Sequence, residues 1–116
     1  MTPIQHSISL EEAIELTSRF QANRPADMPI CETFEKDSVR KMLQAHGADK
    51  LRIYYGEKED GSVCAVLVAA DAEGNDMLPG VNRNNKNEED DPDEYILENS
   101  YKCPPACPPE SPLNNN

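Results

Sequence analysis

The sequence predicts an α+β fold, in which two helices pack on a small antiparallel sheet built around one β-hairpin. Residues 51–70 are rich in β-branched, aromatic and aliphatic side chains and are interrupted once, at Asp60-Gly61, a dipeptide typical of hairpin turns. Two earlier segments, residues 9–22 and 34–46, place apolar residues at the three- and four-residue spacing of amphipathic helices.

A two-residue turn at Asp60-Gly61 fixes which side chains share a face of the hairpin. It places Ile53 opposite Val68, and the more apolar face then carries Leu51, Ile53, Tyr55, Val66, Val68 and Ala70. We expect this face to point inward, because an isolated hairpin is marginal in water. The opposite face carries Arg52, Tyr54, Lys58 and Leu67. Arg and Tyr are common interface anchors, so these four residues are a candidate binding surface, although a solvated sheet face explains them equally well.

The helix over residues 9–22 is predicted to begin with a capping box, in which the Ser9 and Glu12 side chains satisfy free backbone donors of the first turn. The second helix is predicted from Phe34 to His46 and ends at Gly47, a residue suited to the left-handed position after a helix. The expected core is Leu10, Ile14, Phe20, Val39, Met42, Leu43, Leu51, Ile53, Val66 and Val68.

Composition divides the chain into three parts. Residues 1–79 form the predicted α+β domain, with a third strand from 76–79 or 94–98. Residues 80–94 are acidic and Asn-rich, with little apolar surface to bury, and are predicted to be a disordered linker. Residues 95–116 combine a short apolar island with a Cys- and Pro-rich tail that is expected to be extended.

A net charge of −11 over 116 residues narrows the function classes. A strongly acidic chain repels phosphate backbones, which disfavours nucleic-acid binding, and is compatible with a basic protein partner as well as with simple solubility. No apolar run reaches the ~18 residues of a membrane helix, and the N-terminus lacks the positive segment of a secretory signal. We expect a cytoplasmic protein with no membrane partner, and its oligomeric state stays open.

The string Cys103-Pro-Pro-Ala-Cys107 has three open interpretations. The leading one is a docking tail with free thiols, and the others are a disulfide that pins the tail and a metal or redox pair. A thiolate zinc site needs two further ligands, which are missing at short spacing. A redox pair normally has two intervening residues at a helix start, and a reducing cytoplasm opposes a disulfide.

No complete catalytic constellation is present. His6 and His46 match no nucleophile–base pattern, and no nucleotide-binding or hydrolase motif occurs. The acidic cluster over residues 71–76 has its glycine at the fourth position rather than the sixth position of a calcium loop, and is predicted to be a turn. We therefore expect no cofactor, and enzymatic activity is left undecided but disfavoured.

Four strings, ISLEEA, RIYYGEKEDG, LVAADAEGNDML and CPPACPPESPLN, resemble a group of small bacterial proteins with no assigned function. The resemblance covers residues 8–78 and 95–114. Its motifs are an F-x-x-D-x-[VI] stretch, an R-I-Y-Y-G strand, a D-x-x-G-N-D turn and a C-P-P-x-C tail. It implies that Arg52, Tyr54, Tyr55 and the tail form one recurring unit, and it implies no activity.

These observations predict a non-enzymatic module that binds another protein through the open hairpin face or an edge strand. The alternative is a Cys-dependent metal-binding or redox protein that uses Cys103 and Cys107.

Overall fold

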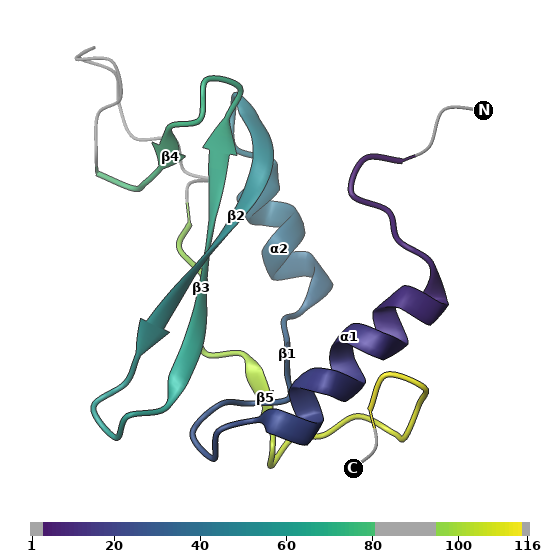
Figure 1. Cartoon of the computed structure of the whole chain (residues 1–116). Coiled ribbons are helices and arrows are strands. Elements are labelled where there is room, and N and C mark those ends of the chain that lie inside the picture. The colour runs from purple at the N-terminus through teal and green to yellow at the C-terminus, as the bar shows by residue number, and fades with distance from the viewer. Residues whose placement is uncertain (1–3, 81–94, 115–116) are drawn as a thin grey trace.

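The computed structural model of the chain describes residues 4–80 and 95–114. Within these ranges it confirms the α+β class, with a three-stranded antiparallel sheet, a two-stranded ladder and two helices (Figure 1). The acidic segment at 81–94, for which the sequence predicts disorder, lies outside the described residues. The elements in chain order are α1 (Leu10–Asn23), β1 (Cys31–Thr33), α2 (Lys36–Leu43), β2 (Ala48–Glu57), β3 (Val63–Asp71), β4 (Asp76–Met77) and β5 (Tyr101–Cys103).

The hairpin formed by β2 and β3 has a longer turn than the sequence predicts. The Lys58 N–H donates to the Ser62 carbonyl at 2.8 Å, and the Gly61 N–H donates to the Lys58 carbonyl at 2.9 Å. The loop therefore has three residues, 59–61, rather than two. Gly61 has a φ of 90°, a left-handed conformation that glycine adopts without the strain of a Cβ atom. Three-residue loops that end on such a residue are a common hairpin form.

The extra loop residue changes the register of the hairpin. Ile53 lies opposite Leu67, and Tyr54 lies opposite Val66, so the predicted Ile53–Val68 pair is wrong. A shift of one residue moves the side chains of one strand to the other face of the sheet. Leu67 therefore shares a face with Ile53, while Val66 and Val68 share the face of Tyr54.

Helix α2 packs on the face of the sheet that carries Leu67. Its eight residues span ~12 Å, whereas the ten residues of β2 span ~33 Å. The short helix approaches both strands, and it packs with Leu67 and Ala69 of β3 while Leu51 and Ile53 of β2 stay exposed. The buried cluster between the helix and the sheet is Met42, Ala45, Leu67, Ala69 and Met77, bordered by the partly buried Phe34, Val39, Ala48, Ala65 and Leu97.

The core is smaller than the sequence predicts. Of the expected core residues, Met42 and Val68 are buried, and three are partly buried: Ile14, Val39 and Val66. Five are exposed: Leu10, Phe20, Leu43, Leu51 and Ile53. The two in β2 are exposed because α2 is too short to cover the length of that strand, and the two in α1 are exposed because that helix packs outside the core cluster.

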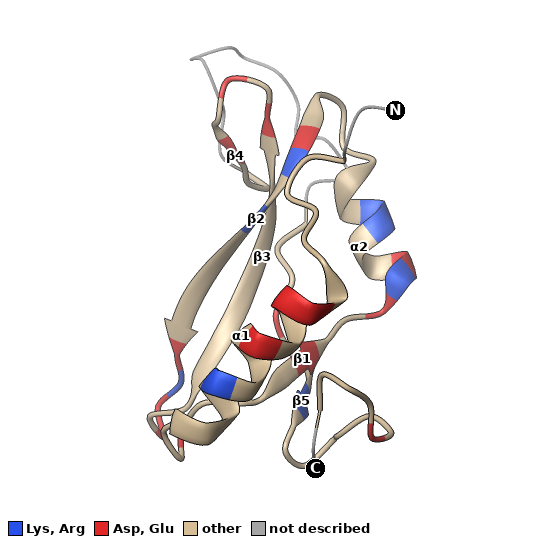
Figure 2. Ribbon diagram, turned by 45° about the vertical axis from the view of Figure 1, so that its right-hand side comes forward, with Lys and Arg blue, Asp and Glu red and all other residues tan. Residues whose placement is uncertain are grey.

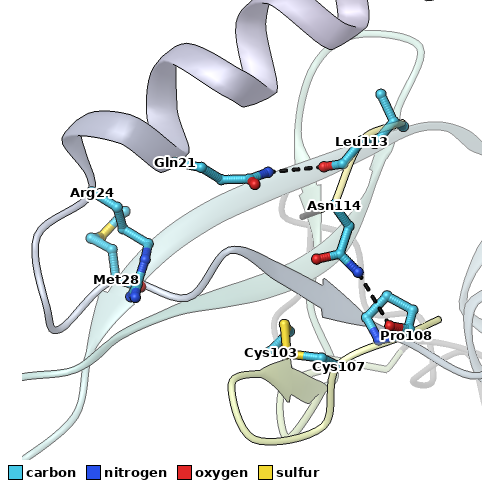
Figure 3. The surroundings of a disulfide bond; sticks show 8 residues. All are labelled: Gln21, Arg24, Met28, Cys103, Cys107, Pro108, Leu113 and Asn114. Atoms are coloured by element: carbon cyan, nitrogen blue, oxygen red, sulfur yellow. Dashed lines mark hydrogen bonds between the residues drawn. A yellow bond between two sulfur atoms is a disulfide. The ribbon is translucent and has the colours of Figure 1, made fainter. Parts of the chain in front are cut away.

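Helix α1 forms as predicted but does not enter the core. The capping box is present, since the Glu12 N–H donates to Ser9 Oγ at 3.1 Å and the Ser9 N–H donates to Glu12 Oε1 at 3.4 Å. The helix lies beside the C-terminal tail, where Gln21 Nε2 donates to the Leu113 carbonyl at 2.8 Å (Figures 1 and 3). None of its residues is buried, and of its apolar stripe Leu10 and Phe20 are exposed whereas Ile14 is partly buried.

The C-terminal segment completes the fold. Strands β1 and β5 pair antiparallel, with Cys31 opposite Cys103. Leu97 forms a bridge with Leu67, because each N–H donates to the carbonyl of the other, at 2.8 and 2.9 Å. Both segments predicted as the third strand therefore pair with β3 on the same side. Residues 76–77 do so as β4, and Leu97 does so as a single bridge.

Candidate functional site

Strand β2 lies at the edge of the sheet, and among the described residues no strand pairs with its outer side. The direction of its amides follows from β3. Leu67 exchanges both backbone hydrogen bonds with Leu97, so the pair Ile53–Leu67 is not hydrogen-bonded across the hairpin. The N–H and C=O groups of Ile53 therefore point outward, and those of Leu51 and Tyr55 do the same because the direction alternates along a strand.

The side chains at these three positions are exposed as well. Leu51 is 44% exposed, Ile53 50% and Tyr55 82%. Natural edge strands are commonly protected by lysines, prolines or bulges. Residues 53–56 of β2 contain no charge and no proline, and the bulge of β2 lies at its start (Figure 2). The middle of β2 therefore presents outward-pointing backbone groups together with apolar side chains.

On the other face of the sheet, Arg52 and Tyr54 converge on one carboxylate. Arg52 Nη1 donates to Asp76 Oδ1 at 2.5 Å and to the Gly74 carbonyl at 2.9 Å. The Tyr54 hydroxyl donates to Asp76 Oδ2 at 2.5 Å. Because β3 lies between β2 and β4, both side chains reach across β3 on the face that carries the buried Val68. The cluster thus covers part of the face that α2 leaves open.

These hydrogen bonds set the charges of the cluster. Donation from Tyr54 and from Arg52 lowers the pKa of Asp76, so this carboxyl group is ionised at neutral pH. The same carboxylate raises the pKa of Arg52 and the pKa of Tyr54. The Arg52 guanidinium is therefore held over the face of the sheet, and its charge does not protect the edge of β2 against pairing with another strand.

The other two residues of the predicted binding surface lie elsewhere. Leu67 is buried beneath α2, on the opposite face from Arg52 and Tyr54, so its placement in an open patch is wrong. The cause is the register, which a three-residue loop shifts by one position. Lys58 lies at the start of the turn and pairs with Glu98.

Lys58 belongs to a charge cluster that joins the hairpin to the C-terminal segment. Glu98 Oε1 lies 3.1 Å from Lys58 Nζ and 3.8 Å from Lys102 Nζ, and Lys102 Nζ lies 3.6 Å from Glu32 Oε1. Glu32 Oε1 also accepts from the Ala65 N–H at 3.3 Å. The hydrogen bond to Lys58 lowers the pKa of Glu98 and raises the pKa of Lys58. This cluster holds β1 and β5 against the edge of β3.

Cys103 and Cys107 form a disulfide in the docked tail (Figure 3). The structure thus contains the disulfide rather than the free thiols of the leading interpretation. Cys103 is buried and Cys107 is exposed, while the free and half-buried Cys31 lies opposite Cys103 in the β1–β5 ladder. In the part of the chain that the structure describes, no three His, Cys, Asp or Glu side chains are grouped to hold a metal ion.

The tail is fixed by its own hydrogen bonds beyond the disulfide. The buried Asn114 donates through Nδ2 to the Pro108 carbonyl at 3.2 Å, and its backbone pairs with that of Ser111 (Figure 3). A hollow of about 210 Å³ lies between α2 and the C-terminal segment, lined by residues that include Phe34, Leu97 and Tyr101. It is below the ~300–1,000 Å³ usual for small-molecule sites, so the edge of β2 remains the better candidate.

Sequence reasoning missed two contributors to these sites. A third strand was predicted over 76–79, but the role of Asp76 as a shared carboxylate was not, because it depends on the strand order β2-β3-β4, which places Asp76 two strands away from Arg52. Cys31 was not predicted to contact the tail, because nothing in the sequence specifies that it pairs with Cys103. The uncharged, proline-free run at 53–56 is the one signal that does indicate an open edge.

No protein-family model, curated sequence or solved structure gives a significant match to this chain. Among the helices of the described residues, none has the length and apolar character needed to cross a membrane. The fold and the site therefore define the protein by structure, as a small α+β protein with an edge strand that is uncharged over residues 53–56 and a docked tail that contains a disulfide.

Proposed function

We propose that this protein is a non-enzymatic protein-binding module that accepts an extended strand from a partner along the outer edge of β2. The observation that carries this proposal is the coincidence of three outward-pointing backbone positions with three exposed apolar side chains, at Leu51, Ile53 and Tyr55. In strand addition, main-chain hydrogen bonds supply affinity and alternate side chains supply specificity. The edge of β2 has both parts of that arrangement.

The chemistry of the edge indicates the partner. Every second side chain of an added strand would lie beside Leu51, Ile53 or Tyr55, on the face that α2 covers, and these partner positions should be apolar. The alternate positions would lie beside Lys50, Arg52 and Tyr54, whose polar groups favour small hydroxyl side chains. The chain carries a net charge of −11, which repels a second copy and favours a basic partner. The proposed ligand is therefore an extended apolar and hydroxyl-bearing segment of a basic protein.

The test uses the peptide KKVTVTVKK as a model of such a segment. Binding to the full chain is measured by titration, and hydrogen exchange of the β2 amides is measured with and without the peptide. We expect binding, together with slower exchange at Leu51, Ile53 and Tyr55. The variant Ile53→Lys places a charge in the middle of the edge and should weaken binding at least about tenfold.

The matched control is Leu16→Lys on α1, because Leu16 is exposed to a similar extent as Ile53 but lies on a helix outside the sheet. This variant should bind the peptide as the wild type does. Binding that survives Ile53→Lys, or that is lost in Leu16→Lys, would refute the β2 edge as the site. If the unliganded chain is a dimer whose β2 amides are protected from exchange, the strand added to the β2 edge comes from a second copy of the chain and not from a basic partner.

A redox function of the tail is the second candidate. It is favoured by the position of Cys31 opposite one member of the Cys103–Cys107 disulfide.

A further inference from the structure

Three of the four cysteines of the chain meet at the β1–β5 ladder. Cys103 ends β5 and forms the disulfide with Cys107, four residues along the tail. Cys31 begins β1 and lies directly opposite Cys103 as a free thiol. The fourth cysteine, Cys64, is buried in β3.

Directly opposed residues of an antiparallel pair have Cα atoms ~4.5 or ~5.5 Å apart, and both side chains point to the same face. Disulfides join residues whose Cα atoms lie ~4.4–6.8 Å apart. The backbone of the ladder is therefore compatible with a Cys31–Cys103 disulfide without a rearrangement of the strands. Cys103 thus lies within covalent reach of two partners, one within the tail and one across the ladder.

The ladder is held in this register by contacts that do not involve sulfur. The Ile30 N–H donates to the Cys103 carbonyl at 2.7 Å. The next pair along the ladder, Glu32 and Lys102, forms an ion pair with 3.6 Å between Oε1 and Nζ. The Tyr101 hydroxyl donates to Glu35 Oε1 at 3.0 Å. Breaking the Cys103–Cys107 bond therefore leaves Cys31 and Cys103 opposed.

We propose that Cys31 is an exchange thiol that converts the Cys103–Cys107 disulfide into a Cys31–Cys103 disulfide. The Cys31 thiolate attacks Cys103 Sγ, the Cys31–Cys103 bond forms, the Cys103–Cys107 bond breaks, and Cys107 leaves as a thiolate. The proton lost by Cys31 is balanced by the one that Cys107 gains. Among Cys31, Cys103 and Cys107, one disulfide and one thiol are present before and after the step, so no external oxidant or reductant takes part.

Burial decides which sulfur each nucleophile reaches. Cys103 has no exposed surface, whereas Cys107 is exposed. A thiol from solution reaches the Sγ atom of Cys107, whereas the thiol of Cys31, opposite Cys103 in the ladder, reaches the Sγ atom of Cys103. The two isomers differ accordingly. One closes the loop 103–107 and keeps the thiol half-buried at Cys31, and the other joins β1 to β5 covalently and presents the thiol of Cys107 at the surface.

The exchange is tested on the full oxidised chain without added reductant. N-ethylmaleimide traps free thiols, the reaction is quenched with acid, and the labelled positions are mapped by mass spectrometry of the non-reduced digest. We expect each molecule to carry a label at Cys31 or at Cys107, never at both and never at Cys103. In Cys31→Ser, labelling at Cys107 should fall at least about tenfold, because the attacking thiol is missing. Labelling of Cys64 reports whether the fold is intact in each sample.

A second variant tests the geometry directly. Cys107→Ser leaves Cys31 and Cys103 as the pair, and treatment with oxidised glutathione should join them in a monomer. Cys103→Ser is the matched control, in which no Cys31–Cys107 disulfide is expected. The proposal is overturned if Cys107 stays unlabelled in the wild type, if its labelling does not depend on Cys31, or if Cys107→Ser keeps the Cys31 and Cys103 thiols free. None of these results bears on peptide binding by β2, which has its own readout.

Discussion

Truncation of Met42 to alanine tests where the core of this protein lies. Met42 lies on the inner face of α2, where it is fully buried in the cluster that includes Leu67 and Met77. Replacing a buried methionine by alanine removes its transfer free energy and leaves a cavity, which together cost about 2–5 kcal/mol. Small domains have urea m-values of about 1–3 kcal/mol/M, so the midpoint of unfolding should fall by roughly 1–2 M.

The control is Leu10→Ala on α1, where the side chain is 62% exposed. Full burial of a leucine contributes about 1.5–3 kcal/mol, so the covered remainder is worth about 1 kcal/mol or less. Urea unfolding followed by circular dichroism measures both variants under the same conditions. A loss of stability in Leu10→Ala equal to that in Met42→Ala would refute the reasoning, because α1 would then be part of the core.

Three further changes test the polar network and the turn. The pKa of Asp76 is lowered in the folded state, so the advantage of the wild type over Asp76→Asn should be complete above about pH 5 and disappear as the pH falls through about 4 and below, as measured by urea unfolding across pH. Gly61→Ala should cost about 1 kcal/mol or more, because the φ of 90° is strained for alanine, and a thermal melt that matches the wild type would contradict this. Glu98→Gln should destabilise the chain by leaving Lys58 and Lys102 without their shared carboxylate, and the loss should shrink in 1 M NaCl if the ion pairs cause it.

Local features of the sequence were sufficient to predict the local structure. The capping box at Ser9 and Glu12 starts α1 as expected, since both hydrogen bonds lie within one turn. The hairpin was recognised from its β-branched run and its glycine. A single unpredicted loop residue was enough to shift its register, because Asp-Gly suits two-residue turns and is also compatible with a three-residue loop that ends on Gly61.

Long-range features were not predictable from the same patterns. The amphipathic spacing of α1 is as regular as that of a core helix, yet no sequence feature specifies the surface against which its stripe packs. The partner of β1 lies some 70 residues along the chain, at β5, and that pairing alone brings Cys31 to Cys103. Leu51 and Ile53 at the candidate edge were likewise assigned to the core. They are exposed because the length of α2 limits how much of the sheet the helix covers.

The dependence of the sheet on Leu97 and β5 has a consequence for synthesis of the chain. A protein leaves the ribosome N-terminus first, so residues 48–77 emerge before the segment that closes the far side of β3. Until residue 103 clears the exit tunnel, β1 lacks the strand that pairs with it, and Leu67 lacks its bridge. A product terminated near residue 80 would therefore expose strand edges on both sides of the hairpin, a form suited to capture by chaperones or to aggregation.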